Sequence, residues 1–554
     1  MTEPEPGWPS EFAERYRAAG HWAGTTLGER FAESVRTNAE RIAVVDRERR
    51  TTYRELGRLV DRLATALAAR GICRGATVVF QLPNVLEFVV AYFACLRVGA
   101  VPLACHPSHR HTEIQQLATL TKAAAWIFPS ELRGFDHVAM AEQVRRELPA
   151  LRELFVVGAR AAPGMTLLSE LLAEPGAGDD PRRDAATARE LDALRPRPSD
   201  CAVFQLSGGT TGLPKVIPRT HDDYLYNSLR FAEVSGFDRD SVLLVSLPVA
   251  HNFPLACPGI QAALLLGARV VLASSPSPDV VFPLIERESV TWIPAVPATV
   301  ITWTNDPGRA RHDLRSIRTL AVGGQRLSAG PAAAAIAAFG DVLCQVYGMA
   351  EGLLCCTRAG DPEEVVLGTQ GRPISADDEV RIVDAAGRDV APGEAGELLC
   401  RGPYTIRGYH EAEAHNRVAF TADGFYRTGD VVRAHPSGNY VVEGRSKDMI
   451  NRGGEKISAE EVENLLLTHP SVLDAAVVAM PDPVLGERAC AFVVTRPGEV
   501  LTLEDLRTYL TLVRPVASFK RPDRLEIRER LPSTAVGKVS KAELREEIAK
   551  LVSR

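Results

Sequence analysis

Lysine is scarce in this sequence: the 554-residue chain has 8 lysines against 56 arginines. Codon bias would account for the ratio alone, but Lys215, Lys447, Lys456 and Lys538 all fall in the motifs described below. A lysine ammonium is a compact point charge, whereas an arginine guanidinium is a planar fork. We therefore expect these lysines to mark places where a guanidinium would not suit the chemistry.

An excess of positive charge is also absent. The net charge is -6 and the isoelectric point is near 6.1, which disfavours nucleic acid and anionic membrane surfaces as partners. No stretch approaches the roughly 18 apolar residues of a membrane-spanning helix. The opening MTEPEPGWPSEF lacks the basic start and apolar core of a signal peptide. We expect a cytoplasmic protein that acts on small molecules or proteins.

The ten cysteines show neither a C-x-x-C pair nor a His/Cys metal spacing, and most stand in apolar runs. A disulfide framework or a structural zinc site is therefore not expected. Most of the cysteines are predicted to be buried thiols.

The chain is longer than one hydrophobic core usually supports, so at least two domains are expected. Thr52-x-x-Glu55 is a capping-box pattern that opens an amphipathic helix closing at Gly71. Apolar strand patterns then alternate with helical ones, as in ATVVFQL, VLEFVVAYFACLRV and VPLA, and the alternation resumes after residue 200. This order predicts an α/β fold with parallel sheets. Residues 173–200, rich in Pro, Gly, Asp and Arg, are expected to form a surface crossover.

A smaller unit of mixed helices and strands follows residue 444. EEVENLLLTHP and LEDLRTYLTLV predict helices, and VLDAAVVAM and RACAFVV predict strands. We place an N-terminal domain at residues 1–443, a hinge at 444–447 and a C-terminal domain at 448–554.

Residues 207–215, SGGTTGLPK, follow an apolar strand pattern and carry the residue types that hold phosphate. Glycines allow backbone N–H groups to approach phosphate oxygens, threonines add hydroxyl donors, and lysine adds charge. The adjacent Gly-Lys-Ser/Thr of a P-loop is missing, so ordinary P-loop chemistry is disfavoured. A flexible surface turn is the alternative.

Together with four further motifs, this loop resembles the adenylate-forming (ANL) superfamily of acyl and aryl acid ligases over essentially the whole chain. The further motifs, in chain order, are YGMAE (347–351), YRTGD (426–430), GRSKD with NRGGEKI (444–448 and 451–457) and PSTAVGK (532–538). The resemblance implies a large N-terminal domain of parallel-sheet subdomains with a small barrel-like part, and a small mobile α+β C-terminal domain.

The resemblance also implies the roles of individual residues. Lys538 would be the catalytic lysine, Glu351 would help hold Mg²⁺, and Lys447 would be the hinge about which the small domain rotates. Gly453 and Gly454 would line the pantetheine channel. ATP would be bound by Ser207, Gly208, Gly209, Thr210, Thr211, Gly212, Lys215, Gly324, Tyr347, Gly348, Asp430 and Arg445. Lys541 is expected to be only a surface cation.

The stretch AHNFPLAC at residues 250–257 resembles the signature of the aryl-acid branch, which also accounts for Ala350 where other branches have threonine. Asn252 takes the place where amino-acid-activating relatives carry an aspartate, and a neutral amide can hydrogen-bond an ortho-hydroxyl. A core histidine and a turn asparagine are the structural alternative. The expected acid-binding residues are His251, Asn252, Phe253, Cys257, Gly324, Met349 and Leu354.

We therefore expect a stand-alone aryl acid:AMP ligase that uses ATP and Mg²⁺ and loads the phosphopantetheine arm of an aryl carrier protein, as in siderophore biosynthesis. An aryl-CoA ligase and a non-catalytic nucleotide-binding protein are the alternatives. Ligases for 2,3-dihydroxybenzoate resemble one another in having serine at position 257 and tend to have valine at position 354. Cys257 and Leu354 therefore favour salicylate over 2,3-dihydroxybenzoate.

Overall fold

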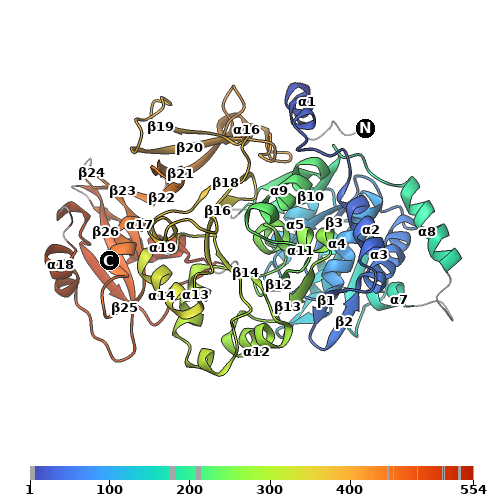
Figure 1. Ribbon diagram of the computed structural model, residues 1–554, viewed down its shortest axis with the longest axis horizontal. Coiled ribbons are helices and arrows are strands. Elements are labelled where there is room, and N and C mark those ends of the chain that lie inside the picture. The colour runs from blue at the N-terminus through green and yellow to red at the C-terminus, as the bar shows by residue number, and fades with distance from the viewer. Residues whose placement is uncertain are drawn as a thin grey trace.

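The computed structural model describes residues 7–173, 181–207, 214–445, 448–452, 455–482, 485–514, 516, 518–534 and 538–552. Within these residues, two large sheets occupy one end and the centre of the molecule (Figure 1). The nine-stranded sheet has the spatial order β18 (Arg372–Pro373), β17 (Gly352–Cys356), β16 (Leu343–Met349), β15 (Thr319–Val322), β14 (Trp292–Ala295), β12 (Val242–Val245), β13 (Arg269–Leu272), β1 (Ile42–Asp46) and β2 (Arg49–Thr52). The seven-stranded sheet has the order β11 (Val216–Thr220), β10 (Cys201–Leu206), β4 (Val101–Ala104), β3 (Thr77–Phe80), β5 (Ala125–Pro129), β8 (Glu153–Val157) and β9 (Thr166–Leu167).

The inner strands of both sheets run parallel, as the sequence alternation predicts. Side chains on successive strand positions point to opposite faces, so each strand contributes to two cores. In β12, Leu243 faces the core between the two sheets and Leu244 faces the outer core. Val78 and Val79 of β3 divide in the same way between the central core and the outer face of the seven-stranded sheet. The two sheets thus share one central hydrophobic core.

Helices fill that central core and cover both outer faces. Helix α4 (Leu86–Val98) is buried at every position except Glu87 and ends at Gly99, which adopts a left-handed φ of 71°. Helix α3 (Tyr53–Ala68) begins with the predicted capping box, in which Glu55 N donates to Thr52 Oγ1 and Thr52 N donates to Glu55 Oε2. The other helices of the N-terminal region are α1 (Ser10–Ala18), α2 (Leu27–Thr37), α5 (His111–Leu120), α6 (His137–Glu147), α7 (Leu168–Leu172), α8 (Pro181–Ala193), α9 (His221–Val234), α10 (Asn252–Ala256), α11 (Gly259–Leu266), α12 (Pro278–Glu288), α13 (Pro297–Asn305), α14 (Ala329–Phe339), α15 (Glu363–Gly368) and α16 (Glu413–Ala419).

A four-stranded antiparallel sheet follows the large sheets, in the order β19 (Glu379–Val383), β20 (Ala395–Arg401), β21 (Tyr426–Ala434) and β22 (Tyr440–Arg445). Its core also takes Leu353 and Cys355 from β17, so it packs directly on the edge of the nine-stranded sheet. This part corresponds to the barrel-like region that the resemblance implies.

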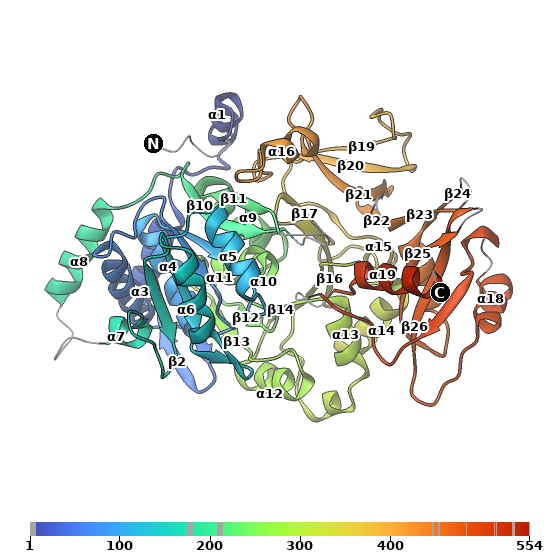
Figure 2. The same ribbon diagram turned by 180° about the vertical axis from the view of Figure 1, so that it is seen from behind.

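The C-terminal elements gather at the opposite end of the molecule from β1 and β2, as both views show (Figures 1 and 2). They are β23 (Met449–Arg452), β24 (Glu455–Ser458), α17 (Ala459–Leu466), β25 (Val472–Asp482), β26 (Gly486–Thr495), α18 (Leu503–Leu512), β27 (Arg524–Ile527) and α19 (Lys541–Val552). Their two cores contain described residues from Ile450 onward and none before it. The boundary at residues 444–447 stays a prediction, because residues 446 and 447 lie outside the described part. Across the described ranges, every helix is too short or too polar to cross a bilayer.

Candidate active site

Lys538 lies at the carboxyl end of β15, a strand from which it is far removed in the sequence. The strand ends at Val322 and continues into Gly323 and Gly324. A Cβ atom built on Gly324 would lie 3.3 Å from Lys538 Cε and 3.9 Å from Lys538 Nζ. Thr534 supports the lysine's backbone on both sides: Lys538 N donates to Thr534 Oγ1 at 3.2 Å, and Thr534 N donates to Lys538 O at 2.6 Å. The predicted catalytic lysine and the predicted Gly324 are therefore together.

The predicted acid-binding residues His251 to Cys257 form the short helix α10 and its ends. Asn252 is buried, and its carboxamide is held on both sides: Oδ1 accepts a hydrogen bond from Tyr224 Oη at 2.7 Å, and Nδ2 donates to Cys257 Sγ at 3.3 Å. His251 caps the helix, with Nδ1 accepting from Phe253 N at 3.2 Å. Burial lowers the pKa of His251 to about 3, and the positive charge of Lys538 acts in the same direction. His251 is therefore neutral, and it lies close enough to Lys538 for the ammonium charge to lower its pKa.

Two glycines after β15 adjoin Phe253, a predicted acid-binding residue, and Lys538. A Cβ atom on Gly323 would meet Phe253 Cε1 at 3.3 Å and Val346 O at 3.1 Å. Gly324 has a φ of +84°, which L side chains rarely adopt. A larger residue at position 323 would crowd the Phe253 ring, and one at position 324 would crowd the Lys538 side chain.

Leu354 lies on β17 of the nine-stranded sheet. It is buried in the central core, which also contains Phe253 and Cys257. A Cβ atom on Gly348 would lie 2.4 Å from Leu354 Cδ2, so a larger residue at position 348 would require the Leu354 side chain to move. Met349, half-buried, packs on the neighbouring core of the four-stranded sheet instead. Leu354 and Cys257 thus belong to the same core, whereas Met349 packs on a different one.

Glu351 belongs to a group of polar side chains on the side of the four-stranded sheet. Its Oε1 accepts a hydrogen bond from Tyr409 Oη at 2.8 Å, and the hydroxyl oxygens of Tyr409 and Tyr426 lie 2.8 Å apart. Lys215 Nζ lies 5.6 Å from the centre of the Tyr409 ring, within cation–π range. The carboxylate and the loop lysine are therefore held around one tyrosine, Tyr409.

Asp430 lies on β21 and is buried beside Tyr347. Tyr347 Oη donates to Asp430 Oδ2 at 2.7 Å, and Asp430 N donates to Thr428 Oγ1 at 3.0 Å. Burial, reinforced by the Asp430 carboxylate, raises the pKa of Tyr347, so the phenol stays protonated and donates. Arg445 pairs with Asp430 across β21 and β22. Three predicted ATP-binding positions thus come together from three separate motifs.

The ends of the glycine-rich loop are joined as a hairpin at the edge of the seven-stranded sheet. Ser207 N donates to Lys215 O at 3.0 Å, and Lys215 N donates to Ser207 Oγ at 3.0 Å. The loop between them, which includes Gly208, Gly209, Thr210, Thr211 and Gly212, lies outside the described residues, as do Lys447, Gly453, Gly454 and the side chain of Arg445. The roles expected of these residues stay predictions.

Three residues that hold the site together were not predicted from the sequence. Tyr224 holds Asn252, Tyr409 holds Glu351, and Arg219 donates from Nη1 to Ala350 O at 2.9 Å. Each partner is between 28 and 131 positions away along the chain. No local motif marks such pairs. The only signal within the sequence is the capping-box pattern Thr220-x-x-Asp223, which directly follows Arg219. That pattern predicts the start of a helix rather than a functional site.

The expectation that Lys541 is only a surface cation is wrong. Its Nζ lies 2.7 Å from Glu463 Oε1, and its side chain is only 18% exposed. The two residues are 78 positions apart and are joined by the packing of α19 and α17 on the C-terminal sheet. The ammonium therefore compensates a buried carboxylate, which would be expensive to leave unpaired.

Comparison with known proteins agrees with this geometry. Residues 31–410 match the family described as AMP-binding enzyme, and residues 461–538 match the AMP-binding enzyme C-terminal domain. A salicylyl-CoA synthase / salicylate adenylyltransferase from Streptomyces sp is 51% identical over 98% of this chain and 97% of its own length. The 2,3-dihydroxybenzoate-AMP ligase of Bacillus subtilis (strain 168) is 48% identical over 98% and 97%. The solved apo structure of MbtA from Mycobacterium smegmatis is 44% identical, covers 98% of both chains and superposes with a TM-score of 0.73.

The match to the first family covers well over half of the chain, and the relatives align along nearly their whole length. The chain therefore belongs to the AMP-binding enzyme family, in the aryl acid AMP ligase branch of the adenylate-forming (ANL) superfamily, and is an adenylating ligase.

Proposed function

We propose that this enzyme activates salicylate with ATP and passes the salicyl group to the phosphopantetheine thiol of an aryl carrier protein. In the first step a carboxylate oxygen of salicylate attacks the α-phosphorus of ATP, the bond to the bridging oxygen breaks, and pyrophosphate leaves. In the second step the thiol sulfur attacks the acyl carbon, AMP leaves, and the thiol proton is released. The product would enter siderophore or related natural-product assembly.

The observation that carries the proposal is the position of Lys538, beside Gly324 and near His251. Lys538 adjoins Gly324 and contributes to the low pKa of His251, so its charge is near the place where the carboxylate would meet ATP. An ammonium there stabilises negative charge as it develops between the carboxylate and the α-phosphate. Phosphoryl transfer depends mainly on such positioning and charge neutralisation.

Asp430 and Glu351 suit the nucleotide end of the reaction. A carboxylate such as Asp430 can accept both ribose hydroxyls at once, and Tyr347 fixes its orientation. Mg²⁺ is usually held by one or two carboxylates together with phosphates and water, which fits Glu351. Among the described residues, no group of three or more His, Cys, Asp or Glu side chains forms a cage for an ion. Bound Mg²⁺ would neutralise phosphate charge.

Salicylate is favoured over 2,3-dihydroxybenzoate by the residues around Asn252. One relative is named for salicylate and the other for 2,3-dihydroxybenzoate, at 51% and 48% sequence identity. Sequence identity alone therefore does not distinguish between the two acids. Cys257 is buried, and burial raises the pKa of its thiol to about 12, so it stays a neutral, weak hydrogen-bonding group. A 3-hydroxyl beside Cys257 and Leu354 would be poorly satisfied, at about 1 to 3 kcal/mol.

Coenzyme A is the second candidate acceptor, because the name of the Streptomyces relative includes a CoA synthase activity. The same aryl-AMP can acylate free coenzyme A or the arm of a carrier protein. The two candidate acceptors can be distinguished by measuring the rate of thioester formation with coenzyme A and with a phosphopantetheinylated aryl carrier protein in parallel. Faster acylation of coenzyme A would overturn the carrier-protein assignment.

The experiment that tests the proposal is acid-dependent ATP/pyrophosphate exchange over a panel of substituted benzoates. We expect exchange with salicylate, weaker exchange with 2,3-dihydroxybenzoate, and dependence on Mg²⁺. Exchange with no hydroxybenzoate would contradict the proposed substrate class.

A further inference from the structure

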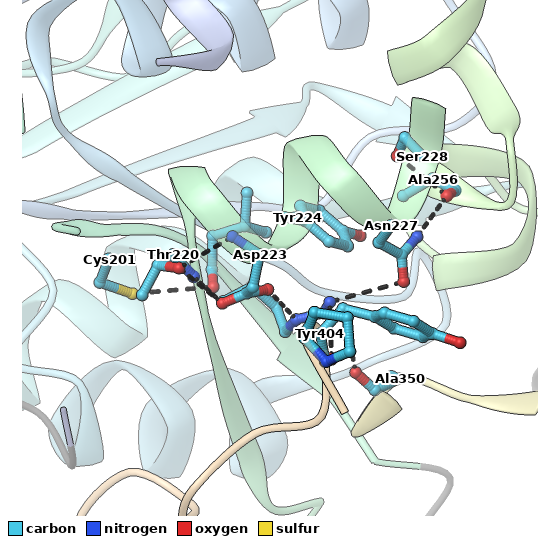
Figure 3. Close-up of polar contacts among 12 residues, drawn as sticks. Cys201, Thr220, Asp223, Tyr224, Asn227, Ser228, Ala256, Ala350 and Tyr404 are labelled. Atoms are coloured by element: carbon cyan, nitrogen blue, oxygen red, sulfur yellow. Dashed lines mark hydrogen bonds and ion pairs between the residues drawn. The ribbon is translucent and has the colours of Figure 1, made fainter. Parts of the chain in front are cut away.

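One face of helix α9 is bonded to the segment that carries Asn252 and Cys257. Residues three and four apart lie on the same side of a helix, and Tyr224, Asn227 and Ser228 have this spacing. Tyr224 Oη donates to Asn252 Oδ1 at 2.7 Å, Asn227 Nδ2 donates to Ala256 O at 2.8 Å, and Ser228 Oγ donates to the same carbonyl at 3.0 Å. Figure 3 shows Asn227 and Ser228 converging on Ala256. The position of α10 is therefore set by buried polar contacts as well as by packing.

Tyr224 itself has little freedom to move. It is completely buried, and the guanidinium of Arg219 lies 4.6 Å from the centre of its ring. Arg219 is in turn fixed by Asp223, at 2.7 Å, and by the carbonyl oxygens of Ala350 and Tyr404 (Figure 3). The phenol ring is thus clamped between a buried ion pair and the acid-binding segment.

The hydroxyl of Tyr224 acts as a donor to Asn252. Burial raises the pKa of Tyr224 well above its usual value, so the proton is retained at every working pH. Because Asn252 Oδ1 accepts this hydrogen bond, the amide nitrogen of Asn252 lies on the opposite side of the carboxamide. One of its two N–H groups donates to Cys257 Sγ, 3.3 Å away. The remaining N–H is what the carboxamide can offer to a ligand.

On the basis of the function proposed above, we propose that Tyr224 is a positioning residue, which holds the Asn252 carboxamide with its N–H toward the substrate. The enzyme thereby selects aryl acids whose ortho substituent accepts a hydrogen bond. Salicylate meets this requirement, because its hydroxyl proton is directed to its own carboxylate and the oxygen is left as an acceptor. In anthranilate the ortho nitrogen is a poor acceptor, since its lone pair is delocalised into the ring, and its N–H groups would face the N–H of Asn252.

The first test uses the unmodified enzyme and ATP/pyrophosphate exchange with salicylate, benzoate and anthranilate. We expect kcat/KM for salicylate to exceed that for anthranilate by about tenfold or more, the effect of one mispaired buried hydrogen bond. Equal use of the two acids would overturn the inference while leaving aryl acid activation in place. Exchange with none of the three acids would overturn the proposed function and the inference together.

The second test is Tyr224→Phe, which removes only the hydroxyl and frees the carboxamide to rotate. The salicylate-to-anthranilate ratio should fall by about tenfold, whereas KM for ATP should not change. Tyr53→Phe is the matched control: its hydroxyl is buried in the same core and donates to the carbonyls of Ala268, at 2.6 Å, and Ala263, at 3.3 Å. A similar fall in melting temperature is expected for both variants, with no change in the ratio for the control.

The effect of Tyr224→Phe should also be measured in the Asn252→Asp variant, in which the orientation of the side chain no longer matters. The two oxygens of a carboxylate are equivalent, so rotating the group changes nothing that the substrate meets. Tyr224→Phe should therefore lower the salicylate-to-anthranilate ratio in the native background and leave it unchanged in Asn252→Asp. An equal effect in both backgrounds would show that Tyr224 acts only through packing. If Tyr224→Phe does not fold, the ratio measured with the unmodified enzyme still tests the expected preference for an ortho acceptor, and an equal use of the two acids still overturns it.

Discussion

Lys538 and Gly324 meet at the carboxyl end of β15, where a Cβ atom on the glycine would lie 3.3 Å from Lys538 Cε. Ligands of parallel α/β sheets bind at the carboxyl ends of the strands, so the lysine stands where a substrate is expected. Lys538 belongs to the segment just before α19, whereas Gly324 directly follows Gly323 at the end of β15 in the nine-stranded sheet. Under the proposed mechanism, this is the arrangement that serves adenylation.

Lys538→Ala should lower the rate of ATP/pyrophosphate exchange by on the order of 100-fold or more, because it removes the charge that stabilises the transition state. Transfer of the aryl group from a preformed aryl-AMP should fall far less, since the small domain would by then have carried the lysine away. Lys550→Ala, an exposed lysine on α19, is the control and should leave both steps unchanged. Equal losses in the two half-reactions would contradict the assignment.

Lys447→Pro should retain pyrophosphate exchange and lose thioester formation. A hinge residue absorbs the backbone rotation between two states, and proline restricts that rotation. Lys447→Ala keeps the backbone free and is the matched control, which should load carrier protein at close to the native rate. Single-turnover loading of a carrier protein measures the effect. A proline variant that loads at the native rate would place the hinge elsewhere.

His221 should make the folded state less stable as the pH falls from 7 to 5. Burial lowers its pKa to about 4, against the opposing charges of Asp200 and Glu29, while an unfolded histidine titrates near 6.5. Between these values the unfolded chain binds a proton that the folded chain does not, so the free energy of unfolding decreases with falling pH, by about 2 kcal/mol at pH 5. His221 Nδ1 accepts from Leu27 N at 3.3 Å.

His221→Asn can keep an acceptor for Leu27 while removing the titrating ring. Denaturant unfolding at pH 7 and pH 5 should therefore show a smaller loss of stability in this variant than in the native protein. Asp378 and Glu460, whose pKa values burial raises to about 7, act in the opposite direction but are present in both proteins. Their contribution cancels in the comparison. An identical pH dependence in the two proteins would refute the prediction.

The sequence predicts those features that depend on residues close together in the chain. The capping box of Thr52 and Glu55, the stop of α4 at Gly99 and the alternation of β3, α4 and β4 are all local, and the structure confirms them. The hydrogen bond between Tyr224 and Asn252 spans 28 positions and that between Tyr409 and Glu351 spans 58. Such contacts depend on how helices and sheets pack, so no local pattern predicts them.

The ion pair of Lys541 shows the same limit in the C-terminal region. A lysine at the start of an amphipathic helix is ordinarily a solvated cation, which is why the sequence predicts a surface position. The fold instead brings Glu463 of α17 to within 2.7 Å of it. A charge that is buried by tertiary packing cannot be distinguished from an exposed one by its sequence neighbours alone.

Cys257→Ser should shift the substrate preference from salicylate toward 2,3-dihydroxybenzoate. The thiol of Cys257 already accepts a hydrogen bond from Asn252 Nδ2 at 3.3 Å and is buried beside this residue, which the 2-hydroxyl is proposed to meet. A serine hydroxyl at this position can bond a 3-hydroxyl, whereas a thiol is a much weaker partner. Satisfying that hydroxyl recovers about 1 to 3 kcal/mol, or roughly ten- to a hundredfold in the ratio of the two kcat/KM values.

Two comparisons make this result specific to position 257. Cys95→Ser introduces the same hydroxyl in a buried position of α4, in the same core, and should destabilise the protein without altering the ratio. Leu354→Val shortens a side chain in the same core as Cys257 and, combined with Cys257→Ser, should shift the ratio further than either change alone. Steady-state exchange with both acids measures all three effects. A native enzyme that prefers 2,3-dihydroxybenzoate would overturn the choice of salicylate but not the assignment as an aryl acid ligase, because that assignment rests on the family match and not on Cys257.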